Sequence, residues 1–251
     1  MGTFKAYFKK EILESLRQYK YVVLAAGILF FSIADPIMMK LLPSILKAQL
    51  HGDLSSLFIT NRRIVMQSYV SHLFQLGVMF VVFTAANSLS DEISTKKFVF
   101  PYAKGSSPGG IVLAKISHYS IVIVILTICG FVINHYYTNM LFKNDTVSIT
   151  NVIISAGLIS VYFIFNIILA TFFSSLLKKG IAAGFVTIGI GYFSILLNNT
   201  KIIGDYIPNK LVSNASSFNN VNSVKALAFA SICSILLIII TIYRMNRVEV
   251  V

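Results

Sequence analysis

The stretch SDEISTKKFVFPYAKGSSPGGIVLAK, residues 90–115, separates two long apolar runs and differs from both in composition. It holds two acids, four lysines, two prolines and three glycines. The chain as a whole is 56% hydrophobic and 12% charged, with a mean hydropathy of +0.79, whereas a soluble domain carries about twice that charge. Uncharged runs of roughly 18 residues or more are typical of membrane-spanning helices. The sequence therefore predicts an all-α polytopic membrane protein.

The apolar runs on both sides of residues 90–115 predict six membrane spans within a single domain, residues 1–251. The expected spans lie within residues 21–42, 64–89, 116–139, 149–177, 181–199 and 226–243. Asp35 and Pro36 fall toward the far end of the first span, where we expect the helix to kink or stop, because proline removes a backbone donor. The loop at 200–225 predicts either a plain loop or a pair of short half-inserted helices.

Residues 1–20 precede the six-span bundle, residues 21–251, and have a different pattern. Phe4, Phe8, Ile12 and Leu16 recur at helical spacing, and the charged residues lie mostly off that stripe. This pattern is typical of an amphipathic helix in the membrane interface. A cleaved signal peptide is the rival interpretation, although its polar lead would be unusually long.

The distribution of basic residues predicts the orientation of the spans. Lysine and arginine are more numerous on the side that holds both termini and residues 90–115. The positive-inside rule then places both termini in the cytoplasm. The chain has a net charge of +12, and we expect its basic side chains to contact lipid head groups. No nucleic-acid partner is expected.

The polar residues of the chain show no catalytic or metal-binding constellation. The glycines of KGSSPGG lack the GK[ST] ending of a phosphate-binding loop, so we expect no ATPase or other enzyme activity and no cofactor in this chain. Some polar side chains in or near the spans are candidates either to line a cavity or to pack helices together. These candidates are His72, Gln75, Asn87, His118 and Asn166.

The fifth span is rich in glycine. Small residues allow two helices to approach closely, which predicts that these glycines pack a dimer. The small residues are Gly180, Gly184, Gly189 and Gly191.

The order of these elements resembles the type 2 ABC exporter permease family. That family often has E-x-x-x-G-T, then A-K-P-x-S-R, then a closing lysine after its second span. Glu92 matches the acid and Lys115 the lysine, and Ala103, Lys104 and Ser107 also fit. The sequence departs from the pattern where Lys96 and Lys97 replace Gly-Thr, Gly105 replaces proline and Pro108 replaces arginine. The joint SSLLKKGIAAG after the fourth span is also similar to the family.

The resemblance implies a function. Such permeases place a short coupling helix on the cytoplasmic face between spans 2 and 3, and it docks on an ATPase subunit. The residues implied for this role are Glu92, Lys96, Lys97, Phe98, Phe100, Pro101, Tyr102 and Lys104. The resemblance further implies two ATPase subunits that bind ATP and Mg²⁺, a second permease copy or a relative, and a bacterial plasma membrane. Spans 1, 2 and 5 would form the cavity and the dimer contact.

We expect the cargo to be hydrophobic or amphipathic, because few charges are available to line a cavity. A peptide toxin, an antimicrobial peptide or an antibiotic fits this expectation. Two alternatives stay open. One is an ion-coupled secondary transporter or channel that uses Asp35, His72 or His118. The other is a membrane immunity or scaffold protein that transports nothing.

Overall fold

The computed structural model describes residues 2–49, 61–143, 145–197, 200, 204–219 and 222–247. These residues form helices joined by short connections, without a strand in the described part of the chain. The helices are α1 (Thr3–Arg17), α2 (Lys20–Gln49), α3 (Arg62–His72), the π-helical turn η2 (Leu73–Gly77), α4 (Val78–Ser94), α5 (Val99–Ala103), α6 (Pro108–Leu141), α7 (Ile149–Leu177), α8 (Gly180–Leu197), α9 (Asn209–Ser217) and α10 (Val224–Asn246).

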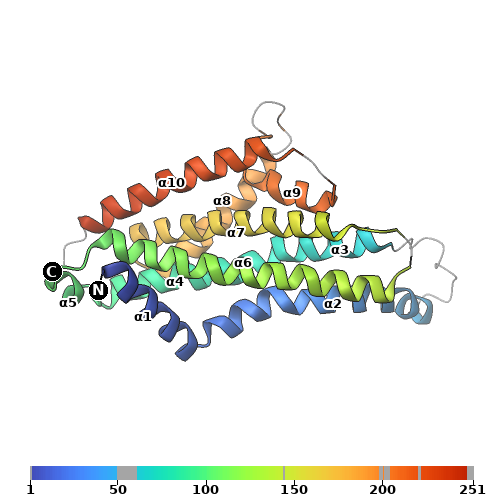
Figure 1. Ribbon diagram of the computed structural model, residues 1–251, viewed down its shortest axis with the longest axis horizontal. Helices are drawn as coiled ribbons and strands as arrows, with labels where there is room; N and C mark the ends of the chain where they lie inside the picture. Colours follow the sequence, from blue (N-terminus) through green and yellow to red (C-terminus); the bar gives the residue numbers. More distant parts are fainter. Residues whose placement is uncertain are drawn as a thin grey trace.

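The helical segments include five that are long and apolar enough to cross a membrane, which is the architecture of an all-α polytopic membrane protein. These segments are Lys20–Ile45, Arg62–Ser94, Pro108–Leu141, Ile149–Leu177 and Val224–Asn246. The second segment joins α3, η2 and α4 without a break. A sixth apolar segment, Gly180–Leu196 of α8, is shorter. The long helices run roughly lengthwise through the molecule in Figure 1.

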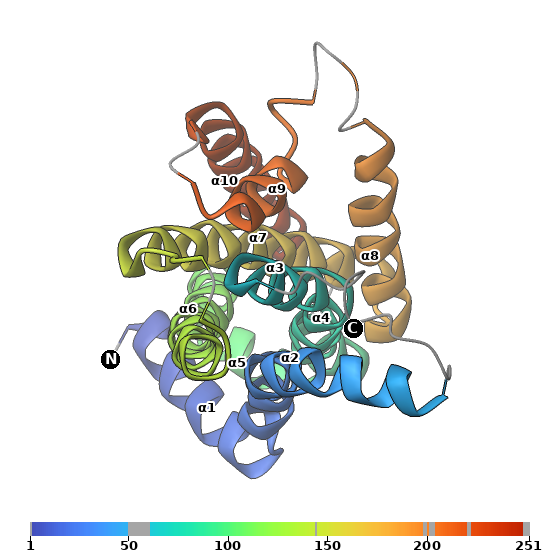
Figure 2. The same ribbon diagram turned by 90° about the vertical axis from the view of Figure 1, so that its right-hand side faces the viewer.

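Helix α7 occupies the centre of the bundle. It contacts α4, α6, α8, α9 and α10, and in Figure 2 it lies between α9 and α10 on one side and α4 and α6 on the other. Its buried positions extend around much of the helix, as expected for a helix that is apolar on all sides. Phe163 of α7 belongs to the main core together with Tyr69 of α3 and Phe131 of α6. The rings of Tyr69 and Phe131 pack edge to face, with their centroids 5.2 Å apart.

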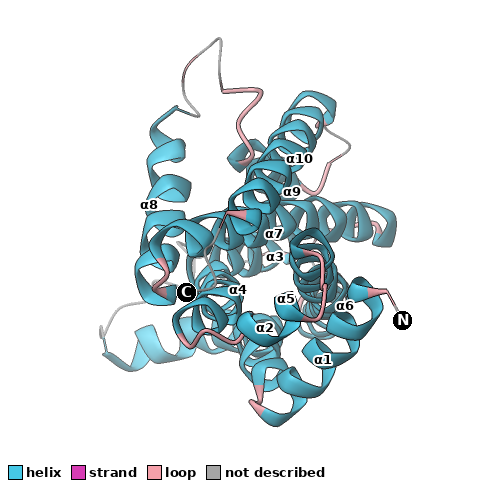
Figure 3. Cartoon of the chain, turned by 90° about the vertical axis from the view of Figure 1, so that its left-hand side faces the viewer, coloured by secondary structure: helices cyan, strands magenta, loops and turns pink. Residues whose placement is uncertain are grey.

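Residues 90–115 form the end of α4, the short α5 and the start of α6, at the end of the molecule that carries the N-terminus (Figures 1 and 3). The Ser107 side chain caps α6 by accepting a hydrogen bond from the Gly110 amide, and Pro108 follows at the first helical position. Gly105 has a φ of +79°, which suits a residue without a side chain. The glycines and proline of this stretch therefore turn the chain into α6.

Helix α1 packs against α6 through its polar side and leaves apolar residues outside. Tyr7, Glu11 and Ser15, spaced four residues apart, are buried, whereas Phe4 and Leu16 of the apolar stripe are exposed. This arrangement suits a helix whose apolar face contacts lipid in the interface.

The structure corrects three expectations about the elements. The first span was predicted to kink or stop at Asp35 and Pro36, and a stop is wrong, because α2 continues through Pro36 and Pro43. Helix α6 begins at Pro108, eight residues before the expected 116, so Lys115 lies within a spanning helix. Among the described residues of the loop at 200–225, one helix, α9, lies between turns and packs on α7.

Candidate functional site

The most unusual feature of the bundle is a buried cluster of opposite charges between α1, α4 and α6. The Lys115 ammonium lies 2.7 Å from Oε1 of Glu11 and 3.1 Å from Oε2 of Glu92. It also donates a hydrogen bond to the backbone oxygen of Ser88 at 3.0 Å. The exposed fractions of Glu11, Glu92 and Lys115 are 0%, 1% and 2%. The first and last residues that match the permease pattern, Glu92 and Lys115, are therefore joined by a buried ion pair.

The cluster extends toward the surface through Lys10, Glu14 and Lys20. Lys10 pairs with Glu92 and, at 3.3 Å, with Glu14, which also contacts Lys20 at 3.4 Å. Burial, together with the nearby Lys115, lowers the pKa of Lys10. Burial alone would raise the pKa of Glu14, but Lys10 and Lys20 outweigh it and the pKa is lowered. The cluster thus balances three carboxylates with three ammonium groups.

The three carboxylates resemble a metal site in spacing only. Oxygens of Glu11, Glu14 and Glu92 lie within 4.8 Å of one another. Each of these carboxylates already contacts a lysine. The lysine ammonium groups, rather than a bound cation, therefore neutralise the negative charge of the three carboxylates. Its role is to fasten α1 onto α4 and α6, because an unpaired buried charge is costly.

Helix α5 projects from the same end of the bundle and is anchored through Phe98, the residue before it. Phe98 is 3% exposed and stacks on Tyr102 with ring centroids 5.6 Å apart, and burial raises the pKa of Tyr102 to about 12. Phe100 points outward and is 67% exposed, with the Lys104 ammonium 4.4 Å from its ring centroid. An exposed aromatic next to lysines on an anchored helix is typical of a protein contact surface.

The predicted coupling residues therefore divide into two groups. Glu92 and Phe98 are buried, so they anchor the segment and cannot contact a partner directly. Pro101 and Tyr102 are half-buried. The exposed members are Lys96, Lys97, Phe100 and Lys104. Val99, which was not among the predicted residues, is also exposed beside Phe100.

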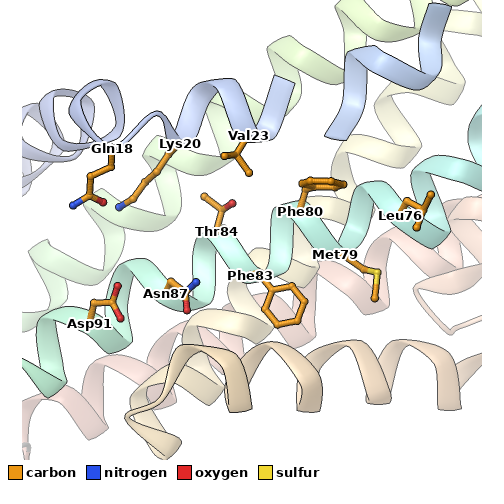
Figure 4. Close-up of a pocket in the computed structure, with 10 residues that line it drawn as sticks. All are labelled: Gln18, Lys20, Val23, Leu76, Met79, Phe80, Phe83, Thr84, Asn87 and Asp91. Atoms are coloured by element: carbon orange, nitrogen blue, oxygen red, sulfur yellow. The ribbon is translucent and has the colours of Figure 1, made fainter. Parts of the chain in front are cut away.

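An open groove of about 600 Å³ runs between α4 and the start of α2 (Figure 4). Its lining residues are Gln18, Lys20, Val23, Leu76, Met79, Phe80, Phe83, Thr84, Asn87 and Asp91. The volume lies within the range of about 300–1,000 Å³ that small-molecule sites occupy. Residues of the first two predicted spans line this groove, whereas none of its lining residues belongs to span 5, which was also expected to contribute to a cavity.

The polar candidates within the spans have different surroundings. Asn87 lines the groove. Asn166 donates a hydrogen bond to the Tyr162 carbonyl at 2.8 Å, and His118 is buried with its Nε2 2.8 Å from the Tyr21 hydroxyl. These two contacts hold helices together or satisfy a helix backbone. Gln75 is exposed and contributes its backbone oxygen to Tyr192.

His72 pairs with Asp35 across α2 and α3. Its Nδ1 lies 2.8 Å from the Asp35 carboxylate, and its ring stacks on Phe31 with centroids 5.2 Å apart. Asp35 is 5% exposed, and its second carboxylate oxygen has no hydrogen-bond partner among the described residues. The π-helical turn η2 begins directly after His72, and such turns are frequent at functional sites.

We expect Asp35→Asn and His72→Gln to destabilise the protein non-additively. Because the two groups act as one contact, the double variant should be no less stable than the worse single variant, with a coupling of about 1 kcal/mol. Thermal unfolding in detergent measures this coupling. The partly exposed pair Arg63 and Asp145, which lies 3.9 Å apart, is the control and should show weaker coupling. Additive losses at Asp35 and His72 would contradict the prediction.

The glycines of α8 are used within the chain. A side-chain carbon at Gly180 would lie 2.8 Å from Cα of Asn87, and one at Gly184 would lie 2.5 Å from the Phe83 ring. Gly180 and Gly184, which were predicted to pack a dimer, therefore pack α8 closely against α4 of the same chain. Gly189 faces open space, and Gly191 lies near the Tyr162 hydroxyl.

Sequence reasoning missed the central member of the charge cluster, Glu11. The available signal was the spacing of Tyr7, Glu11 and Ser15, which places an acid on one side of an otherwise basic helix. That spacing does not reveal which residues the acid contacts.

Comparison with known proteins gives no relative. A search against models of protein families finds no match, and neither does a search of curated proteins. The function is therefore inferred from the residues and their geometry.

Proposed function

We propose that this chain is the transmembrane subunit of an ATP-driven exporter of the type 2 ABC permease kind. It moves hydrophobic or amphipathic cargo, such as a peptide toxin, an antimicrobial peptide or an antibiotic, out of a bacterial cell. Two separate ATPase subunits bind ATP and Mg²⁺, and a second permease subunit completes the pathway. In this proposal α8 is the fifth of six spans, and both termini lie in the cytoplasm.

The observation that carries the proposal is the exposed Phe100 and Val99 on α5, with Lys96, Lys97 and Lys104 around them. Helix α5 lies between the second and third spans, which is where the permease family places its coupling helix. A groove with an apolar floor and an acidic rim on the ATPase is the partner surface that complements it.

The charge cluster supports a route from α5 to the spans. Glu92 ends the span that leads into α5, and its partner Lys115 belongs to the span that follows. Glu11 joins both to α1. A displacement of α5 by the ATPase would therefore move α1, α4 and α6 together, because separating these helices would leave buried charges unpaired. The groove on α4 and α2 is the proposed cargo path.

Co-purification tests the proposal directly. The tagged chain is purified from its native membranes, and an ATPase that co-purifies is identified by mass spectrometry. With that ATPase, Phe100→Ser is expected to weaken binding at least about tenfold, which is typical of a central aromatic contact. Substrate-stimulated ATP hydrolysis should fall in parallel.

The matched control for Phe100→Ser is Met140→Ser, which replaces an exposed apolar residue at the far end of α6. It should leave binding and ATP hydrolysis unchanged. An ATPase that binds Phe100→Ser as tightly as the unmodified chain would contradict the role of α5. The absence of any ATPase in the purified complex would contradict the exporter proposal itself.

The Asp35–His72 pair favours a second candidate, an ion-coupled secondary transporter. Ionisable residues inside spans mark ion or proton routes in many transporters, and this pair joins two helices. Transport into liposomes that contain only this chain, driven by a pH gradient, would support the second candidate. Its loss in Asp35→Asn would then assign the coupling.

A further inference from the structure

The groove on α4 and α2 is polar at one end and apolar at the other. Lys20, Asn87 and Asp91 line the end nearest α1, together with Gln18 and Thr84. Val23, Leu76, Met79, Phe80 and Phe83 line the rest, which extends deeper along the spans (Figure 4). This gradient matches an amphiphile that keeps its head at the membrane surface and its apolar body within the bilayer.

The two charges at the polar end are not equivalent. The Lys20 ammonium is paired with Glu14 at 3.4 Å and is part of the balanced charge cluster. The Asp91 side chain is exposed, and among the residues that the structure describes no lysine, arginine or histidine forms a salt bridge with it. The Lys115 ammonium therefore acts on Asp91 only from beyond salt-bridge distance, and the Asp91 carboxylate stays open to a ligand in the groove.

We propose that the groove binds cationic amphiphiles, with the positive head beside the Asp91 carboxylate and the apolar body along Val23, Leu76 and Phe80. The inference rests on the proposed export function in one respect, because the bound amphiphile would then be the exported cargo. The groove volume of about 600 Å³ accommodates a molecule of drug size.

The carboxylate also explains how the groove discriminates against the lipids around it. The cytoplasmic leaflet is rich in anionic lipids, and their head groups would be repelled by Asp91. A cationic head gains a charge-assisted contact instead. Asp91 therefore acts as a specificity-determining residue by favouring one head-group charge.

Photolabelling tests the inference with two probes that share a decyl chain bearing a diazirine. One probe has a trimethylammonium head and the other a sulfate head. The chain is reconstituted in nanodiscs of zwitterionic lipid without nucleotide, and labelled peptides are mapped by mass spectrometry. Labelling of residues 76–87 is divided by labelling of Ile232 and Ile235 on α10, which are exposed and report general contact with the bilayer.

The trimethylammonium probe is expected to label residues 76–87 in preference to α10, and the sulfate probe is not. Asp91→Asn should lower the normalised labelling by about three- to tenfold, the range for losing one partly solvated charge contact. Asp145→Asn, which removes an exposed carboxylate outside the groove, is the matched control and should have no effect.

Equal labelling by both probes, or unchanged labelling of Asp91→Asn, would overturn the inference. The groove would then accept apolar chains with any head group.

The Thr84→Trp variant tests the groove itself, because the larger side chain fills it. Labelling should be abolished while the melting temperature is retained. Labelling that persists in this folded variant would also overturn the inference. Because the assay contains no ATPase, its outcome is independent of the co-purification experiment. A chain that passes the labelling test but recruits no ATPase keeps this inference and loses the proposed function.

Discussion

Replacing Lys115 by methionine is expected to destabilise the protein by about 3–5 kcal/mol, the usual cost of removing one partner from a buried ion pair. The substitution keeps most of the side-chain volume but leaves Glu11 and Glu92 facing each other without the ammonium that lies within 3.1 Å of both. Helix α1 should then detach first, because its main polar anchor is Glu11.

Two measurements check this expectation. The melting temperature in detergent should fall, and trypsin should cleave the Lys115→Met variant at Arg17 under conditions in which the unmodified chain resists. Lys143→Met is the matched control, because Lys143 is exposed and lies at the other end of α6, beyond Leu141. A Lys115→Met variant that melts and resists trypsin like the unmodified chain would contradict the anchoring role.

A rescue experiment separates charge from packing. Adding Glu11→Gln and Glu92→Gln to Lys115→Met neutralises the two carboxylates that lost their contact with the Lys115 ammonium. The triple variant should recover at least half of the lost stability, because a neutral buried set is often as stable as an ion pair. No recovery would indicate that the lysine acts through its packing alone.

Gly180→Ala is expected to destabilise the protein by about 1–3 kcal/mol, as overpacking of a tight contact does. The added carbon would lie 2.7 Å from Oγ of Ser90 and 2.8 Å from Cα of Asn87, so α8 must move away from α4. The backbone contact cannot be relieved by a rotamer change, which is why a single methyl group has a large effect.

Gly189→Ala is the matched control in the same helix. Nothing lies within 4 Å of its added carbon, so it should be neutral or stabilise by up to about 1 kcal/mol through helix propensity. Thermal unfolding of both variants measures the difference. Equal stability of the two would contradict the tight α4–α8 packing. Destabilisation by Gly189→Ala alone would instead place that glycine in a contact with another subunit.

The sequence predicted the helical class and most spans but misplaced several boundaries. Pro36 suggested a kink or a stop because proline lacks a backbone donor, and the stop is excluded because α2 continues through it. Residues 90–115 looked like an extended cytoplasmic connector, but α6 begins at Pro108 and includes Lys115. Local rules place a break where a residue disfavours helix, and they omit the packing that can keep a helix intact.

The candidate site was predicted less completely than the fold. Glu92 and Lys115 were identified through the family resemblance, whereas Glu11 was missed. Phe98, which was predicted as a coupling residue, is buried. Gly180 and Gly184 of α8 were predicted to pack a dimer, and the structure packs them closely against α4 of the same chain. In each case the residue type was informative, and its neighbour was not visible in the sequence.

The sequence by itself determined that this protein is built of long apolar helices, because the length and composition of a run are local properties that the hydrocarbon core selects directly. Only the tertiary structure decided which polar residues share a site. Lys115 and Glu11 are 104 positions apart, and their contact depends on how α1 and α6 are rotated and packed against each other. The same packing leaves Phe100 and Asp91 exposed, so the surfaces available to partners and cargo follow from the arrangement of the helices.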